Sequence, residues 1–145
     1  MSKLRTVSWV WLAIIGVLVL LVSCVSAQLA YWGDFPVGGV AIQEIASGND
    51  SVLLGLRGSR GTAAGWAAAW AVLFLSVVLG PYRRGDVASW WGILASAITL
   101  GVIVALRVPV LGHQAGTGTA LVILLVVILG LLVDVKRIVQ APPAP

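Results

Sequence analysis

The first long apolar run decides the fold class: residues 7–31 read VSWVWLAIIGVLVLLVSCVSAQLAY. The run contains no Asp, Glu, Lys, Arg or His. As an α-helix it would extend about 37 Å, which is enough to cross a hydrocarbon core of about 30 Å. A backbone exposed to lipid must satisfy its own hydrogen bonds, and a helix does so. The run therefore predicts a membrane-spanning helix.

Three further runs without ionisable side chains follow, at about 62–80, 87–106 and 116–133. They lack the alternation of period two that is typical of outer-membrane barrels. The sequence therefore predicts an all-α fold, an integral membrane four-helix up-down bundle in a single membrane domain spanning 1–145. The stretch 33–61 is expected to be a partly helical outer loop, and residues 138–145 a loose tail.

The composition agrees with a membrane location. Of the 145 residues, 60% are hydrophobic and 10% are charged, whereas soluble domains carry about 25% charged residues. The net charge of +4 comes from basic residues at the ends of apolar runs, where they act as topology signals, so no nucleic-acid partner is expected. The preference for Arg over Lys, with abundant Ala, Gly and Val, favours a bacterial source.

Basic residues also predict the orientation. One side would hold six of them, Lys3, Arg5, Arg83, Arg84, Lys136 and Arg137, and the other side three, Arg57, Arg60 and Arg107. The positive-inside rule then places both termini in the cytoplasm of a bacterial inner-membrane protein. All seven tryptophans fall near the predicted interfaces, where an indole is favoured.

The outer loop is the most informative segment for function. The sequence predicts two short amphipathic helices: one beginning near Asp34-Phe35-Pro36, with its apolar face formed by Val37, Val40, Ala41 and Ile45, and one over 52–56, capped by Asn49-Asp50-Ser51. One interpretation is a lid over the helix ends. The alternative is a ligand or partner site that uses Asp34, Glu44, Arg57 and Arg60.

Two glycines four residues apart, Gly61 and Gly65, predict a close helix contact. We expect this contact within the chain, and homodimerisation is the alternative. Gly130 lies in a run of large aliphatic residues, so a larger side chain is expected to be tolerated there if that face meets lipid.

Residues that carry chemistry are few. The chain has one cysteine, Cys24, and one histidine, His113, so an internal disulfide is impossible. No nucleophile with a base, carboxylate pair, phosphate loop or metal-ligand spacing is present, so we expect no enzyme activity, no catalytic residues, no metal and no cofactor. Leu21 to Cys24 fits a lipoprotein signal and Val25-Ser26-Ala27 a signal-peptidase site, but the apolar run continues to Tyr31, which favours an uncleaved helix.

The turn Pro81-Tyr-Arg-Arg-Gly-Asp86, followed by Trp90-Trp91, resembles a pattern of small four-helix bacterial membrane proteins of unknown function. The general layout is also similar to the DoxX-like group. This resemblance implies a four-helix bundle and brings no catalytic residues.

The preferred functional hypothesis is a non-catalytic accessory or structural subunit, embedded in the lipid bilayer, that packs against another membrane protein or against copies of itself. The second hypothesis is a module that binds a lipid or another hydrophobic small molecule at the outer loop. A membrane redox or transport component is the third, and it rests on architectural analogy alone.

Overall fold

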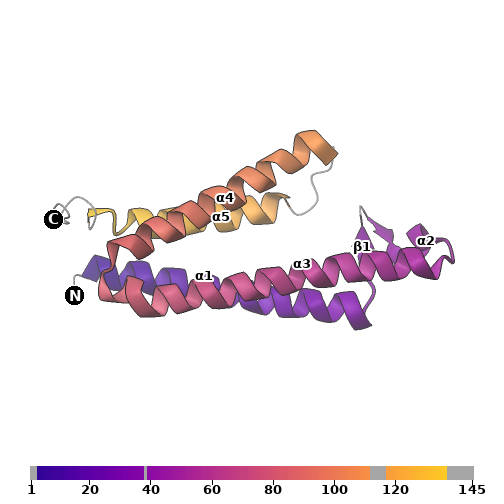
Figure 1. Ribbon diagram of the computed structural model, residues 1–145, viewed down its shortest axis with the longest axis horizontal. Helices are drawn as coiled ribbons and strands as arrows, with labels where there is room; N and C mark the ends of the chain where they lie inside the picture. The colour runs from indigo at the N-terminus through magenta and orange to yellow at the C-terminus, as the bar shows by residue number, and fades with distance from the viewer. Residues whose placement is uncertain (1–2, 38, 112–116, 137–145) are drawn as a thin grey trace. The chain divides into compact units, whose positions relative to one another are not determined.

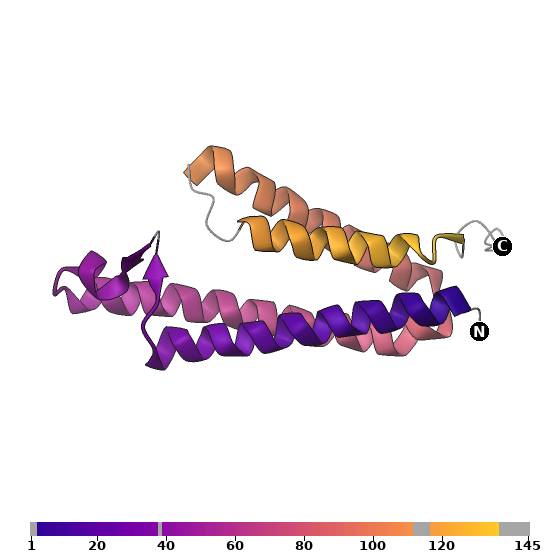
Figure 2. The ribbon, with the colours of Figure 1, turned by 180° about the vertical axis from the view of Figure 1, so that it is seen from behind.

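The computed structural model describes residues 3–37, 39–111 and 117–136, and these are mostly helical (Figures 1 and 2). The elements are α1 Lys3–Trp32, β1 Pro36–Val37, β2 Val40–Ala41, α2 Ile42–Ala46, α3 Asp50–Val77, the π-helical turn η1 Val78–Tyr82, α4 Val87–Leu111 and α5 Thr117–Leu132. The expectation of an all-α fold is confirmed at the level of fold class. His113 and the tail at 138–145 lie outside the described residues.

Among the described residues, three stretches are long and apolar enough to cross a membrane: Thr6–Trp32, Asp50–Tyr82 and Val87–Leu106. They include the first three runs that the sequence predicted. The fourth predicted run corresponds to α5, an apolar helix of 16 residues, which extends about 24 Å at about 1.5 Å per residue.

Helix α3 begins at Asp50, well before the expected start near residue 62. The Oδ1 atom of Asn49 accepts hydrogen bonds from the backbone N–H groups of Ser51 (3.0 Å) and Val52 (3.3 Å). The predicted capping residue therefore exists, but it caps a 28-residue helix instead of a short one. The interior glycines Gly55 and Gly58 cost about 1 kcal/mol each relative to alanine and do not interrupt α3.

The segment before α3 differs from the two predicted helices. Pro36 lies in an antiparallel hairpin, where it pairs with Ala41, and does not begin a helix. Only one short helix follows, α2, which buries Ile42 and Ala46 while Ile45 stays exposed. Because the two strands take up residues 36–37 and 40–41, the helical periodicity starts later and the buried face shifts away from the predicted one.

The connection between α3 and α4 is the predicted turn. Gly80 leaves the helical region (φ −92°, ψ −106°), and Pro81, which has no N–H, follows it. Asp86 then caps α4: its carboxylate accepts hydrogen bonds from the backbone N–H of Ser89 (2.8 Å) and of Ala88 (3.4 Å), and from the Ser89 hydroxyl. Beyond the turn, α4 continues to Leu111, so part of the expected link at 107–115 is helical.

The described residues fall into two compact units. The terminal unit contains the residues up to Gly16 and those from Phe74 onward, and the central unit contains Val17–Leu73. The core of the terminal unit includes Leu12, Phe74, Val78, Tyr82, Trp90, Ile93, Val127 and Leu131. The core of the central unit includes Ala30, Phe35, Ile42, Ala46, Ala64 and Ala71. Both cores are small for so apolar a chain.

Candidate functional site

Arg57, one of the predicted binding residues in the central unit, contacts the end of α1. Its guanidinium group donates hydrogen bonds to the carbonyl oxygens of Tyr31 (3.4 Å) and Gly33 (3.3 Å). Carbonyl groups at a helix C-terminus lack partners inside the helix and carry partial negative charge, which a cation stabilises. Arg57 Nε is buried and has no hydrogen-bond partner in the described part of the chain. Arg57 therefore acts as a C-terminal cap for α1.

Arg60, one turn further along α3, holds the hairpin. Its Nε donates a hydrogen bond to Ser26 Oγ (3.4 Å), and its Cζ lies 4.1 Å from the centroid of the Phe35 ring. Phe35 is only 4% exposed, so the ring is held on one side by this cation–π contact. Arg60 thus connects α1, the start of the hairpin and α3.

The two acidic candidates are placed differently. Asp34 and Glu44 are exposed, and within the described ranges neither side chain makes a hydrogen bond or an ion pair. The structure therefore does not bring the four predicted residues into one charged site: both arginines support local structure, and both carboxylates face outward.

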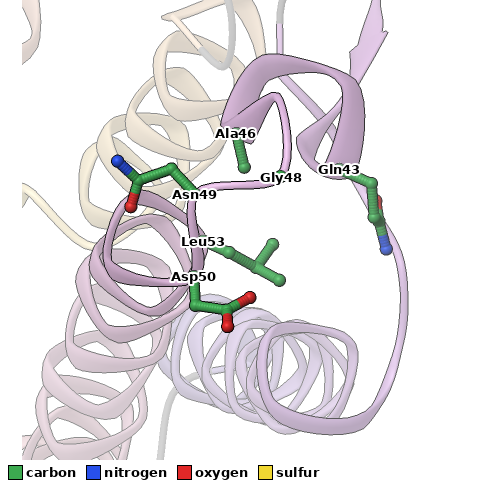
Figure 3. Close-up of a pocket in the computed structure, with 6 residues that line it drawn as sticks. All are labelled: Gln43, Ala46, Gly48, Asn49, Asp50 and Leu53. Carbon is green, nitrogen blue, oxygen red and sulfur yellow. The ribbon is translucent and has the colours of Figure 1, made fainter.

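A shallow hollow lies beside α2. It has a volume of about 110 Å³ and is lined by Gln43, Ala46, Gly48, Asn49, Asp50 and Leu53 (Figure 3). The Leu53 side chain points into this hollow, whereas the Asn49 amide turns away from it (Figure 3). Asn49 already caps α3, and the other polar side chains in the lining are those of Gln43 and Asp50.

The two predicted packing glycines differ from each other. A Cβ atom built on Gly61 would overlap the ring of Tyr31, so this glycine permits a close approach of α1 and α3. A Cβ atom on Gly65 would meet nothing within 4 Å. Within the central unit, this face of α3 is exposed at Gly65.

The terminal unit contains a buried polar cluster that the sequence did not predict. Ser8 Oγ lies 2.6 Å from Tyr82 Oη and donates a hydrogen bond to the carbonyl oxygen of Gly130 (2.7 Å). Both Ser8 and Tyr82 are 0% exposed. Together with Trp90 and Leu131 they form what we name the Ser8 junction, which joins α1, η1, α4 and α5.

The Ser8 junction completes the C-terminal end of α5. The last four carbonyl groups of a helix lack partners within it. Here Gly130 O accepts from Ser8 Oγ, and Leu131 O accepts from Trp90 Nε1 (3.1 Å). The carbonyl oxygens of Leu129 and Leu132 accept from the backbone of the following turn, at 3.2 and 3.3 Å. Every one of the four carbonyls thus has a donor, and two of the donors are side chains from other helices.

Gly130 is the point of closest approach between α1 and α5. A Cβ atom on Gly130 would lie 2.9 Å from Leu12 Cδ2 and 2.9 Å from Trp11 Cδ1. The absence of a side chain also leaves the Val126 carbonyl open to a hydrogen bond from Trp11 Nε1 (3.2 Å). The condition for tolerating a larger side chain at Gly130, a face that meets lipid, is therefore not fulfilled, because this face of α5 packs against α1.

An apolar groove runs beside the Ser8 junction. It has a volume of about 250 Å³, its surface is almost entirely apolar, and it is lined by Val7, Ser8, Trp11, Leu129, Gly130 and Val133. The only hydroxyl in this lining, that of Ser8, already makes two hydrogen bonds. The groove therefore suits a hydrocarbon group and offers no reactive chemistry.

The charged residues near the turn between η1 and α4 are mainly basic. Arg83 Cζ lies 4.8 Å from the centroid of the Trp9 ring, and the side chains of Arg84 and Lys136 are exposed. Asp134 is 7% exposed and Asp86 caps α4, so neither carboxylate is freely presented. The described residues contain no group of three His, Cys, Asp or Glu side chains that could hold a metal ion.

Comparison with protein-family models, curated proteins and solved structures finds no match for this chain. The likeness in layout to DoxX-like proteins therefore stays a prediction. The functional argument rests on the residues and their geometry.

Proposed function

We propose that this protein is a multi-pass membrane protein with a non-catalytic role, an accessory or structural subunit that packs against another membrane protein or against copies of itself. In this arrangement α1, α3, α4 and α5 each cross the membrane as a four-helix bundle. The α5 helix is the shortest, and its proposed crossing rests on its apolar composition and on the capping of its end by the Ser8 junction.

The observation that carries the proposal is the exposure of the long helices. In each of the three apolar stretches, only 22% of a strongly apolar 18-residue window is buried. Side chains such as Leu21, Val22, Leu73 and Ile103 are 57%, 64%, 68% and 62% exposed. Apolar area of this extent in water would cost about 25 cal/mol per Å², so lipid or a protein partner must cover it.

The Ser8 junction supports the proposed topology. Its hydrogen bonds bring the first turns of α1, the turn between η1 and α4, and the end of α5 to the same end of the terminal unit. The basic residues Arg83, Arg84 and Lys136 follow these elements in the sequence. An end of a bundle that gathers basic residues is the cytoplasmic one under the positive-inside rule, and both termini would then lie in the cytoplasm of a bacterial inner-membrane protein.

A lipid-binding module at the outer loop has less support. Arg57 and Arg60 are engaged with α1 and Phe35, and the hollow beside α2 measures only about 110 Å³. A redox or transport role has no side-chain cluster in its favour. The subunit hypothesis needs neither a cluster nor a cavity.

Isolation in a mild detergent followed by native mass spectrometry tests the proposal. We expect the full chain to leave the membrane fraction only with detergent, and to carry a protein partner or a second copy at a fixed ratio. A monomeric chain recovered in the soluble fraction without detergent would contradict membrane insertion. A detergent-soluble monomer with no partner would contradict the subunit role and leave insertion standing.

A further inference from the structure

We propose that the groove beside the Ser8 junction holds an acyl chain of an anionic phospholipid, whose headgroup lies among the basic residues at that end of the terminal unit. The inference rests on the proposed membrane insertion and adds a ligand of stated chemistry. It assigns this ligand to α1 and α5, not to the outer loop.

The lining of the groove fits hydrocarbon. Val7 and Trp11 contribute from α1, Leu129 contributes from α5, and Val133 contributes from the turn that follows α5. These side chains are 57%, 46%, 49% and 39% exposed, so they are accessible from outside the terminal unit. The groove has no unpaired hydroxyl to desolvate, since the Ser8 hydroxyl is already bonded to Tyr82 and Gly130. A saturated chain therefore gains contact there without leaving a polar group unsatisfied.

The charges near the groove favour an anionic headgroup. Val133 lines the groove, and Lys136 follows it after a single turn. Arg83 and Arg84 stand in the turn whose Tyr82 is bonded to the groove residue Ser8. Of the carboxylates in this region, Asp134 is buried and Asp86 caps α4. Basic residues at a membrane surface attract anionic lipid, each by a modest amount.

The size of the groove favours a lipid chain over a partner helix. An α-helix with its side chains has a diameter of about 10–12 Å, and a cavity of about 250 Å³ cannot enclose one. A single acyl chain is slender and can follow a cleft between two helices. The polar backbone of α5 is also already satisfied at this end, so no hydrogen bond is left for a docking peptide.

The test uses the purified full chain in detergent, incubated with phosphatidylglycerol or with phosphatidylcholine and analysed by native mass spectrometry. We expect one phosphatidylglycerol to be retained and phosphatidylcholine to be lost. Val133→Trp, which fills the groove from the turn after α5, should abolish retention, and Val7→Trp should do the same from α1. Leu125→Trp, on a residue of α5 that is 57% exposed and does not line the groove, is the matched control and should retain lipid normally.

A second pair of variants tests the headgroup. Arg84→Gln and Lys136→Gln should each weaken retention by roughly fivefold, the factor expected for one charge near the membrane surface. Melting temperatures of all variants show whether they fold. Equal retention of the two lipids, or unchanged retention in folded Val133→Trp and Val7→Trp, would overturn the inference. A protein bound in the groove in place of lipid would also overturn it, and neither result would contradict membrane insertion itself.

Discussion

Ser8 Oγ and Tyr82 Oη lie 2.6 Å apart although 74 residues separate them in the chain, and both residues are 0% exposed. Ser8 donates its single hydroxyl hydrogen to the carbonyl oxygen of Gly130 on α5. The hydroxyl of Tyr82 therefore donates to Ser8 Oγ, which accepts. One hydroxyl group thus bridges α1, η1 and α5. A buried hydroxyl without a partner is costly, and this makes the bridge a specific link between these three elements.

The Ser8–Tyr82 pair should show energetic coupling. Ser8→Ala and Tyr82→Phe each remove the shared hydrogen bond, and each should destabilise the protein, since interhelical hydrogen bonds in membrane proteins contribute about 0.6 kcal/mol on average and up to about 1.7. The double variant should cost less than the sum of the two single variants, because only the first change breaks the bond. Thermal unfolding of all four proteins in one detergent measures this coupling. Strict additivity would show that the bond contributes nothing.

Gly130 and Gly65 should respond in opposite ways to a larger side chain. Gly130→Leu places atoms where Leu12 and Trp11 already lie, and overpacking of this kind costs about 1–3 kcal/mol. Gly65→Leu meets open space and should leave the stability of the monomer unchanged. Melting temperatures of the two variants measure this difference in stability. A larger loss at Gly65 would indicate that its exposed face packs against another chain, as the homodimer alternative requires.

The sequence predicted the long helices because hydropathy and helix length are local properties. The runs at 7–31 and 87–106 lie within α1 and α4, and Pro81, in the predicted turn, lies between α3 and α4. The Asn49 cap was also predicted, since side-chain capping involves only neighbouring residues. Features of this kind depend on a few consecutive residues, which a single sequence displays.

The remaining features depend on contacts between distant residues. The extension of α3 to Asp50 accompanies the contacts of Arg57 and Arg60 with α1 and Phe35, which hydropathy does not register. Which of Gly65 and Gly130 faces a neighbour depends on the rotation of each helix, and a uniformly apolar helix does not reveal its rotation. Ser8 places a hydroxyl group near the start of an apolar run, and this was the one feature of the sequence that indicated the Ser8 junction.

Arg57 should stabilise the C-terminal end of α1. Arg57→Gln removes the cation from the carbonyl groups of Tyr31 and Gly33, and such an interaction with a helix end contributes about 0.3–1 kcal/mol. Arg57 caps α1 and is therefore not a free surface charge. Hydrogen exchange should therefore become faster at the last turn of α1. Glu44→Gln, at an exposed side chain of the same unit, is the control and should leave exchange unchanged.

The proposed topology places Glu44 and Arg84 on opposite sides of the membrane, because α3 lies between them in the chain. Cys24 is exposed on α1 and is first replaced by alanine, which leaves a chain without other cysteines. Single cysteines are then introduced as Glu44→Cys and Arg84→Cys, since both native side chains are exposed and five of the six basic residues on the inner side remain. An impermeant thiol reagent should label the first variant in intact cells and the second only after permeabilisation. Labelling in the reverse order would invert the orientation, and labelling of both in intact cells would show that α3 does not cross the membrane.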